Sequence, residues 1–557
     1  LMLPALAIAQ QQETVETEDV DEVIVIGRSV ATGLTQVEVN QEMLVDTAAV
    51  LKDIPGANVN ANGPVTGIAQ YRGMYGARIA TSLDGTQLAP SGPNWMDPPI
   101  SYARSGQLES LEIYRGIAPV DVAQESIGGA IDARTSRGEF TQSTDFSANG
   151  KLMGSLQSAN QGAQISGAVF AANHRHKLNL AAVTESGEDA RFPGGDISPT
   201  EYQRQRYDMG YGLKLGEHSF HIDLGYNDTG ESGTPALPMD IKDFGGDIQE
   251  FGYRFQRADA LEVAVTLFAS QLDHNMTNYH LRPGPADAAR WRRNLADSDN
   301  SGFRLHSRMY DPQGSWTFGA DGFSARHNSD IDNPNNPMFS VINFNDAERE
   351  ILGLFLQREQ QFNSHWRGEF GLRYNRVAMD AGVVDGTPAN LMPPAAALRD
   401  AFNNADREQT DYNADLVAKL WYQQSPGRQW YAGMAQKTRS PSYQERYLWL
   451  PMEATAGLAD GNTYTGNIEL EPEVVELGAH VVGILHHTTL LLPDLRQALD
   501  LGLGGRAVAV VELKPWPVRI RVDGRHGIQV ITHIQPFHLA EPVAEGRRLL
   551  PADLHHG

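Results

Sequence analysis

The stretch of sequence that decides the fold runs from Ile68 to Thr135 and reads IAQYRGMYGARIATSLDGTQLAPSGPNWMDPPISYARSGQLESLEIYRGIAPVDVAQESIGGAIDART. Its apolar residues form short runs of strand length at Ile79–Leu83, Leu108–Tyr114 and Ala130–Ala133. Glycine and proline cluster between these runs, where turns are needed. The pattern predicts a compact α/β unit of short strands, in which glycines let segments of backbone approach each other closely.

Composition narrows the classes of function that the 557-residue chain can have. Its 69 acidic and 45 basic side chains give a net charge of −24, which argues against a nucleic-acid partner because no basic face is available to neutralise phosphates. The absence of cysteine removes disulfides, thiolate metal sites and cysteine nucleophiles. No clean apolar run reaches the roughly 18 residues of a membrane helix. A membrane β-barrel stays open, because its signal is a weak alternation of polar and apolar residues.

The N-terminal residues have the features of an exported protein. Residues 1–10 are apolar and end in Ala7-Ile8-Ala9, which matches the cleavage site of a secretory signal and predicts the remnant of a signal peptide; a frayed apolar terminus is the alternative. Residues 11–30 begin as a polar, acidic segment and are expected to be flexible. A β-prone run within them is suited to adding a strand to another protein's sheet, and it consists of Glu22, Val23, Ile24, Val25 and Ile26.

Beyond Gly138 the sequence alternates between apolar and polar residues. Three runs show this alternation, at residues 218–227, 366–375 and 412–422. In the second run, the apolar residues Trp366, Phe370, Leu372 and Tyr374 alternate with the polar residues Arg367, Glu369, Arg373 and Asn375. A period of two with one apolar and one charged face is typical of a strand that meets lipid on one side and water on the other. The charged set argues against a dry sandwich core, where unpaired arginine and glutamate are costly to bury. A soluble sheet with one wet face remains open on this pattern alone.

A series of short motifs lies just before and within the stretch from Ile68 to Thr135. In order, the motifs are Leu51–Gly56, Tyr71–Met74, Arg78, Leu83–Gly85, Leu108–Gly116 and Ser126–Ile131. Their order and spacing resemble the plug domain of TonB-dependent outer-membrane receptors. The residues that carry this resemblance are Arg72, Gly73, Arg78, Asp84, Gly85, Glu109, Gly116, Gly128 and Gly129.

The resemblance implies a membrane β-barrel, of about 22 strands in the family, with an N-terminal α/β plug domain inside its lumen. It implies that residues 31–138 are the plug, that residues 139–475 are the barrel and that Glu22–Ile26 are the TonB box. The implied partners are TonB with its inner-membrane energising complex and the lipid of the outer membrane of a Gram-negative bacterium. Two long polar segments, Asn328–Asp346 and Pro388–Gln409, are expected to be extracellular loops.

The alternating pattern stops before the chain does. Residues 139–475 accommodate roughly 14 strands of ~10 residues with their turns and loops, fewer than the family's barrel. Gly466–Glu473, which reads GNIELEPE, resembles the family segment that leads into a late barrel strand. Residues 476–557 contain no tyrosine but 8 of the 17 histidines. We therefore expect an aberrant C-terminal segment, from a reading-frame change or truncation near residue 476, and an incomplete barrel; a periplasmic extension is the alternative.

Three segments offer soft or borderline metal ligands. Met96 lies in a proline-rich loop of the plug, Met239 ends the run TPALPM, and His274 and Met276 follow an alternating strand. If the extended geometry of that strand continues, His274 and Met276 both face the lumen. An imidazole and a thioether two residues apart on one strand face suit copper(I), and a plug methionine would complete the set. Ordinary packing of each methionine in its loop is the alternative.

These segments resemble the copper-receptor branch of the TonB-dependent family, which implies copper as the transported metal and Met96, His274, Met276 and Met239 as its ligands. That branch carries a cysteine four residues before the plug methionine, where this chain has Gly92. The strongest soft ligand is therefore missing, which predicts weaker binding of copper. Uptake of a ferric siderophore or another metal chelate, bound by aromatic and arginine side chains of the external loops, is the alternative.

Other classes of function find little support. The chain lacks the G-x-S-x-G, P-loop and H-E-x-x-H motifs, and its glycine pair at 128–129 is not a dinucleotide fingerprint. We therefore expect neither an enzyme nor a catalytic cofactor. Two alternatives of another class are a surface-binding protein and a non-functional translation product whose barrel never closes.

Overall fold

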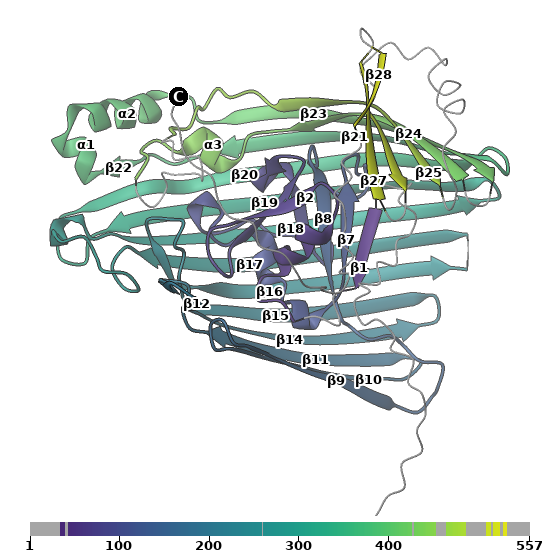
Figure 1. Ribbon diagram of the computed structural model, residues 1–557, viewed down its shortest axis with the longest axis horizontal. Coiled ribbons are helices and arrows are strands. Elements are labelled where there is room, and N and C mark those ends of the chain that lie inside the picture. Colours follow the sequence, from purple (N-terminus) through teal and green to yellow (C-terminus); the bar gives the residue numbers. More distant parts are fainter. Residues whose placement is uncertain are drawn as a thin grey trace, which may run out of the picture.

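The computed structural model of the chain describes residues 34–38, 43–258, 260–425, 428–452, 464–485, 508–513, 516–523 and 527–531. A wall of long strands curves around a smaller group of short strands and turns (Figure 1). No helix among the described residues is both long and apolar enough to cross a membrane. The expected signal remnant and the expected TonB box fall within residues 1–30, which lie outside the described residues.

The inner unit, which we call the plug, is built on a sheet of five strands in the order β1-β7-β8-β5-β6. These strands are β1 (Leu34–Glu38), β5 (Ala80–Leu83), β6 (Thr86–Gln87), β7 (Leu108–Arg115) and β8 (Gly129–Thr135). β5 and β8 are parallel, and the other neighbours are antiparallel. The three apolar runs of the opening stretch thus form β5, β7 and β8. Short 3₁₀ helices connect the plug strands, namely η2 (Thr47–Asp53), η3 (Gly76–Arg78), η4 (Pro93–Trp95), η5 (Pro99–Tyr102) and η6 (Ser105–Gln107).

Two hairpins of the plug depend on unusual backbone angles at their turns. A second small sheet consists of β2 (Ala57–Ala61), β3 (Gly67–Tyr71) and β4 (Met74–Tyr75). The turn between β3 and β4 is Arg72-Gly73, with φ angles of 50° and 84°, and the turn between β5 and β6 is Asp84-Gly85, with φ angles of 54° and 80°. Two successive positive φ angles match the twist of antiparallel strands, and glycine at the second position avoids steric strain. Turn geometry therefore explains these four motif residues.

The wall contains fourteen long strands, each antiparallel to the next one along the chain. They are β9 (Ser147–Gln157), β10 (Gly162–Ala172), β11 (His176–Gly187), β14 (Tyr202–Leu215), β15 (His218–Ser232), β16 (Asp240–Arg257), β17 (Leu261–Thr277), β18 (Arg293–Asp311), β19 (Gly314–Asp332), β20 (Ser340–Gln361), β21 (Trp366–Asp380), β23 (Gln409–Ser425), β24 (Arg428–Arg439) and β25 (Glu473–Leu485). Tight turns, such as residues 216–217 and 312–313, join the strands at one end of the wall, and longer segments join most of them at the other. The number of long strands agrees with the roughly 14 expected from the sequence.

Side chains of the wall strands alternate between the outside and the lumen, as the sequence predicts. On β21, Leu372 and Tyr374 are 50% and 49% exposed, whereas Arg373 and Asn375 are 0% and 1% exposed. The runs on β15 and β23 behave in the same way. The outer face is therefore apolar, and the lumen face carries the polar and charged side chains that meet the plug.

The longer connections differ from the loops that the sequence suggested. β19 continues to Asp332 and β20 begins at Ser340, so most of the expected loop from Asn328 to Asp346 is strand. Most of Pro388–Gln409 is helical, in α1 (Thr387–Leu391) and α2 (Pro393–Asn404). The proline pair at the start of α2 and the alanine-rich run behind it favour a helix within this connection. Other short elements are β12 (Ala190–Phe192), β13 (Gly195–Ile197), η7 (Ala288–Arg290), β22 (Asp385–Gly386) and α3 (Tyr443–Tyr447).

Three short strands follow the fourteen long ones. β25 itself continues past residue 476, the expected end of the barrel pattern, to Leu485. β26 (Val508–Leu513), β27 (Trp516–Asp523) and β28 (Gly527–Ile531) then lie between β25 and β9 in the sheet order and close the ring. β25 and β26 are parallel, with Ile484 opposite Glu512, and β27 and β28 run steeply across the long strands (Figure 1). The ring has fewer strands than the about 22 of the family's barrel.

The apolar core of the plug continues into the wall. Plug residues such as Ile100, Tyr102 and Leu108 belong to one buried cluster with Phe244 of β16 and Leu272 of β17. Burial of this continuous surface fixes the plug against β16 and β17. The metal-ligand candidates lie on this side of the lumen.

Candidate functional site

A plug loop between β6 and β7 is folded around the carboxylate of Asp97, which is 0% exposed. Its Oδ2 accepts hydrogen bonds from the Ser91 amide (2.8 Å), the Ser91 hydroxyl (2.9 Å) and the Tyr102 hydroxyl (2.7 Å). Its Oδ1 accepts a hydrogen bond from the Gly92 amide at 2.7 Å. Two short helices of the loop, η4 and η5, begin with proline, which suits the first turn. These constraints hold Met96, which is 1% exposed, in a fixed place.

Tyr102 ties the same loop to the wall. Burial, together with the charge of Asp97, raises the pKa of Tyr102 well above its ordinary value, so its hydroxyl stays protonated and remains a hydrogen-bond donor. The Tyr102 ring meets Phe244 of β16 edge to face at 5.6 Å, and Phe244 in turn lies 5.6 Å from the ring of His274 on β17. The plug loop and two wall strands therefore share one buried contact.

His274 and Met276 face the lumen near the long-loop end of β17, as the alternation predicts. Leu267, of the opposite parity, is 48% exposed, whereas His274 and Met276 are 1% and 0% exposed. Neither ring nitrogen of His274 has a hydrogen-bond partner among the described residues. Buried polar atoms are normally satisfied, so this imidazole has bonding capacity, for a ligand or a water molecule, that no described residue uses.

Gly92 is the point at which the plug loop meets His274. A Cβ atom at this position would lie 2.6 Å from Nδ1 of His274 and 2.7 Å from Oδ1 of Asp97. Both atoms therefore border the same small space. In the copper-receptor branch that the sequence resembles, cysteine stands at this position, so its side chain would enter the space beside the imidazole.

Arg282 holds the loop that carries Met239. The Arg282 guanidinium donates to both carboxylate oxygens of Asp240, at 2.6 Å from Nε and 2.5 Å from Nη2. It also donates to the backbone carbonyls of Leu237 (2.8 Å) and Thr234 (3.1 Å). The Thr234 amide donates to Asp240 at 2.9 Å. This two-pronged contact fixes the turn, and Met239 within it is 1% exposed.

One large buried apolar cluster, which we call the methionine cluster, contains four buried methionines from separate parts of the chain. These are Met96 of the plug, Met239 of the β15–β16 connection, Met276 of β17 and Met379 of β21. His274 is two residues from Met276 on the same face of β17. Thioethers and imidazole are ligands that suit copper(I). The structure thus places Met96, Met239 and Met276 in the same buried apolar cluster, and His274 on the same face of β17 as Met276.

Two charged residues of the plug motifs stabilise the plug. One binds the plug to the wall, and the other stabilises a turn within the plug. Arg78 donates to Glu473 of β25 at 3.1 Å and lies 3.8 Å from Glu445 of α3. Asp84 accepts hydrogen bonds from the Thr135 amide at 2.8 Å and the Thr135 hydroxyl at 2.7 Å. These residues hold the plug together and bind it to the wall.

The remaining motif residues also have structural explanations. Gly116 and Gly129 adopt positive φ angles of 79° and 115°. A Cβ atom at Gly128 would lie 2.7 Å from Cδ1 of Ile79, so the close approach there requires glycine. Glu109 is exposed on β7.

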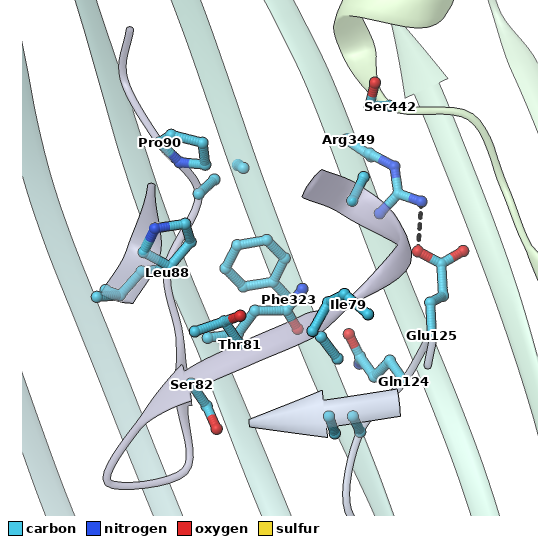
Figure 2. A pocket seen from close by; sticks show the side chains of 18 of the residues that line it. Ile79, Thr81, Ser82, Leu88, Pro90, Gln124, Glu125, Phe323, Arg349 and Ser442 are labelled. Atoms are coloured by element: carbon cyan, nitrogen blue, oxygen red, sulfur yellow. Dashed lines mark hydrogen bonds and ion pairs between the residues drawn. The ribbon is translucent and has the colours of Figure 1, made fainter. Parts of the chain in front are cut away.

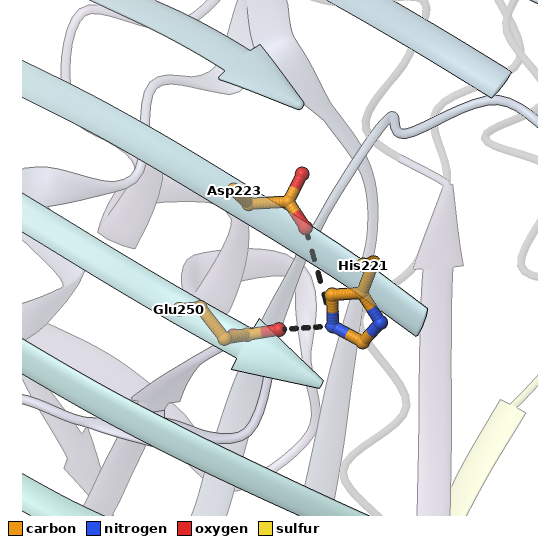
Figure 3. A group of neighbouring side chains, drawn as sticks. All are labelled: His221, Asp223 and Glu250. Atoms are coloured by element: carbon orange, nitrogen blue, oxygen red, sulfur yellow. Dashed lines mark hydrogen bonds and ion pairs between the residues drawn. The ribbon is translucent and has the colours of Figure 1, made fainter. Parts of the chain in front are cut away.

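A polar cluster near the tight-turn end of the lumen was not singled out from the sequence. Nε2 of His221 lies 2.8 Å from Glu250 and 4.0 Å from Asp223 (Figure 3). Arg137, from the link between plug and wall, lies 2.7 Å from Glu250, 3.0 Å from Asp223 and 2.8 Å from Asp84 of the plug. The imidazole and carboxylates are possible metal ligands, but Arg137 already places a cation among them. We interpret the cluster as an ion-pair link between plug and wall.

Comparison with known families gives two matches. The TonB-dependent Receptor Plug Domain matches residues 26–130, and the TonB dependent receptor-like beta-barrel matches residues 183–476. No curated protein matches the chain in sequence. The two matches cover the plug and most of the long strands described above.

Several solved structures share the fold at low sequence identity. The copper transporter OprC is 20% identical, with a TM-score of 0.68 over 81% of this chain and 68% of that chain. The Serratia marcescens hemophore receptor HasR, in complex with its hemophore HasA and heme, is 14% identical, with a TM-score of 0.64 over 83% of this chain and 70% of that chain. The ferric citrate transporter FecA is 14% identical, with a TM-score of 0.53 over 73% of this chain and 63% of that chain.

The barrel match alone spans more than half of the chain, and the plug match covers most of the inner unit. The architecture agrees, because a plug of short strands lies inside a wall of long antiparallel strands in the structure (Figure 1). The resemblance carried by the plug motifs is confirmed. The chain belongs to the TonB-dependent receptor family.

Proposed function

We propose that the chain is a receptor in the outer membrane of a Gram-negative bacterium, and that it takes up a soft metal ion of the copper(I) class into the periplasm with energy delivered by TonB. The observation that carries the proposal is the burial of Met96, Met239 and Met276 within one apolar cluster. His274 stands beside them, with ring nitrogens that have no other partner among the described residues.

The chemistry of these side chains selects the ion. Thioether sulfur and imidazole nitrogen are neutral ligands that suit copper(I), whereas carboxylates and carbonyls suit harder ions. The methionine cluster is apolar, and a singly charged ion is less costly to bury there than a doubly charged one. Asp97 adds a negative charge at the edge of the site, next to Gly92. A copper(I) ion would therefore find both ligands and a compensating charge.

Glycine at position 92 favours reversible binding. Without a thiolate, neutral ligands alone would hold the ion, so we expect weaker binding than at a site that includes cysteine. Weaker binding suits an ion that must later leave the site for the periplasm.

Silver(I), which shares the ligand preference of copper(I), provides the test. In the purified full chain, replacing both His274→Ala and Met276→Ala is expected to weaken silver(I) binding, measured by equilibrium dialysis, at least about tenfold. Met209→Ala is the matched control, because Met209 is 51% exposed on the outer face of β14. Equal silver(I) affinity in the double variant and the control would contradict the assigned site.

Energy coupling has its own test. Proline at Ile24 removes a backbone donor from the expected TonB box and so opposes strand addition. We expect Ile24→Pro to abolish silver(I) uptake by cells and to leave binding by the purified protein unchanged. Cell fractionation accompanies this test, because a chain that remained in the periplasm would support the non-functional alternative instead.

Uptake of a ferric chelate is the second candidate, and the long connections favour it. Tyr279 and Trp291 stack at 4.7 Å, and the Arg292 guanidinium lies 3.9 Å from the Phe339 ring centre. Aromatic and arginine side chains of this kind suit an anionic chelate. If the chain serves a chelate, Trp291→Ala should lower uptake of ferric citrate, and the His274 and Met276 double variant should not.

A further inference from the structure

A cavity of about 160 Å³ lies between the plug and the wall. Figure 2 shows plug residues such as Thr81, Leu88 and Gln124 around it, together with Phe323 and Arg349 of the wall. An engineered apolar cavity of ~150 Å³ in another protein binds benzene. The space between plug and wall is therefore large enough for one small organic ring.

One side of the cavity is apolar. Phe268 of β17 and Phe323 of β19 belong to a small buried cluster, and Ala89 of the plug packs against it. The two phenylalanine rings stack with their centroids 6.3 Å apart. Leu88 and Pro90 of the plug extend the apolar surface (Figure 2). An aromatic ring placed here would be in contact with other rings and with aliphatic carbon.

The other side of the cavity is polar and has an excess of positive charge. Three arginines line it, namely Arg304 of β18, Arg349 of β20 and Arg439 of β24. The carboxylates in its described lining are Glu125 of the plug and Asp321 of β19. Three guanidinium groups against two carboxylates oppose a cation and favour an anion.

Two of the three arginines already have carboxylate partners. Arg349 lies 2.6 Å from Glu125, as Figure 2 shows. Arg439 lies 2.8 Å from Glu445 of α3 and 3.0 Å from Glu473 of β25. The excess charge is therefore on the third arginine.

Arg304 has a guanidinium that no carboxylate of the described residues pairs with. Its Nη2 donates to the backbone carbonyl of Asp121, and neither its Nη1 nor its Nε bonds a described residue. Asp321 is its cross-strand neighbour, but Arg373 donates to both oxygens of Asp321, at 2.8 Å and 2.7 Å. Gln124 donates to the same carboxylate at 2.9 Å. Arg304 therefore keeps free donors for an anion.

The strand register places this guanidinium near the two rings. Gly302 of β18 lies opposite Phe268 on one side and opposite Phe323 on the other. Arg304 is two residues from Gly302 on the same face, which is roughly 7 Å along the strand. A molecule with an anionic group attached directly to an aromatic ring spans such a separation.

We propose that this cavity binds a small aromatic carboxylate, with its ring against Phe268 and Phe323 and its carboxylate on the guanidinium of Arg304. Burial of a carboxylate is costly unless it is paired, and the planar guanidinium can offer it two N–H donors. Because the plug and the wall both line the cavity, a bound ligand would favour the state in which the plug is seated in the wall. This site is separate from the proposed metal ligands and does not depend on them.

Benzoate is the probe, and benzyl alcohol and benzylamine are its neutral and cationic counterparts of similar size. Titration calorimetry of the purified full chain would give the three affinities. We expect benzoate to bind about tenfold more tightly than benzyl alcohol, and benzylamine to bind most weakly. Equal affinities for benzoate and benzylamine would overturn the proposal.

Replacement of Arg304 tests the assigned anion partner. Arg304→Gln should weaken benzoate binding about tenfold and leave the affinity for benzyl alcohol unchanged. Arg254→Gln is the control, because the Arg254 side chain is 58% exposed and does not line the cavity. Equal benzoate affinity in Arg304→Gln and in the control would contradict the role of Arg304.

A variant that fills the cavity tests the location without changing any charge. Ala89→Leu should abolish the binding of both benzoate and benzyl alcohol, and Ala148→Leu, at an exposed position of β9, should not. Hydrogen exchange gives a second readout, since benzoate should slow exchange in the plug peptide from Ile79 to Pro90. Full benzoate affinity in Ala89→Leu would overturn the proposal, even if Arg304→Gln failed to fold.

None of these measurements uses a metal ion. Loss of silver(I) binding in the double variant of His274 and Met276 therefore says nothing about the cavity, and benzoate binding says nothing about the metal site. Failure of the proposed function and failure of this inference are thus separate results.

Discussion

Replacing Asp97 by asparagine tests whether this carboxylate shapes the plug loop at the proposed site. The substitution keeps the size of the side chain but removes its charge, and one of its two acceptor atoms becomes a donor. Oδ2 of Asp97 receives three hydrogen bonds and Oδ1 receives one from the Gly92 amide. An asparagine that keeps its oxygen at the Oδ2 position must therefore face the Gly92 amide with its own NH₂ group.

The magnitude follows from that mismatch. A buried donor that loses its partner costs about 1–3 kcal/mol, and hydrogen bonds to a charged acceptor contribute about 1.5–3 kcal/mol each. We expect the closed loop to lose about 2 kcal/mol, which is a factor of about 30 in the equilibrium constant between closed and open loop. If the closed loop is the state that binds the metal, silver(I) affinity falls in proportion to the fraction of closed loop that is lost.

Hydrogen exchange of the peptide that spans Ser91 to Tyr102, together with silver(I) binding, provides the assay. In Asp97→Asn we expect exchange in this peptide to be about thirtyfold faster, and silver(I) binding to weaken as far as the open loop becomes populated. Glu109→Gln is the control, because it removes the same charge from an exposed position of the plug. Unchanged exchange in Asp97→Asn would refute the role of the carboxylate.

Three further outcomes follow from other contacts. Arg282→Lys keeps the charge but loses the two-pronged contact with the Met239 loop, so silver(I) affinity should fall about tenfold, whereas the same change at the exposed Arg191 of β12 should have no effect. Arg373→Ala breaks a buried pair with Asp321 and should loosen the plug by about 3–5 kcal/mol, seen as faster exchange around residue 120. Burial raises the pKa of Asp132, although Arg134 offsets part of the shift, so plug stability should fall as the pH rises from about 4 through the raised pKa. Urea unfolding of Asp132→Asn should lack this dependence.

The strands of the wall could be predicted because the hydropathy of each residue indicates which side of the sheet its side chain faces. Leu372 and Arg373 are neighbours in sequence, yet Leu372 is 50% exposed on the outer face and Arg373 is 0% exposed in the lumen. Their hydropathy alone predicts which of the two faces lipid. The same parity argument placed His274 and Met276 in the lumen. Met96 was singled out as a thioether in a proline-rich loop, but nothing in that loop indicates which wall residues it meets.

Contacts between distant segments could not be predicted in this way. His327 stacks on Tyr443, and Arg137 binds Glu250, which lies 113 positions away in the sequence. Because these partners are far apart in the sequence, no local periodicity predicts either contact. The α2 helix is a different case. Its signals, a proline pair followed by alanines, were present in the sequence and outweighed the polar composition that suggested a loop.

The position of β1 has a mechanical consequence. β1 is an edge strand of the plug sheet and is held to β7 by five residue pairs, from Leu34 opposite Tyr114 to Glu38 opposite Ser110. Tension applied to the chain before Leu34 is borne by these pairs first. Their rupture would release β1 and leave the pairing of β7, β8 and β5 intact. The plug can thus yield in steps, and the first step would lengthen the tether without disturbing the loop that holds Met96.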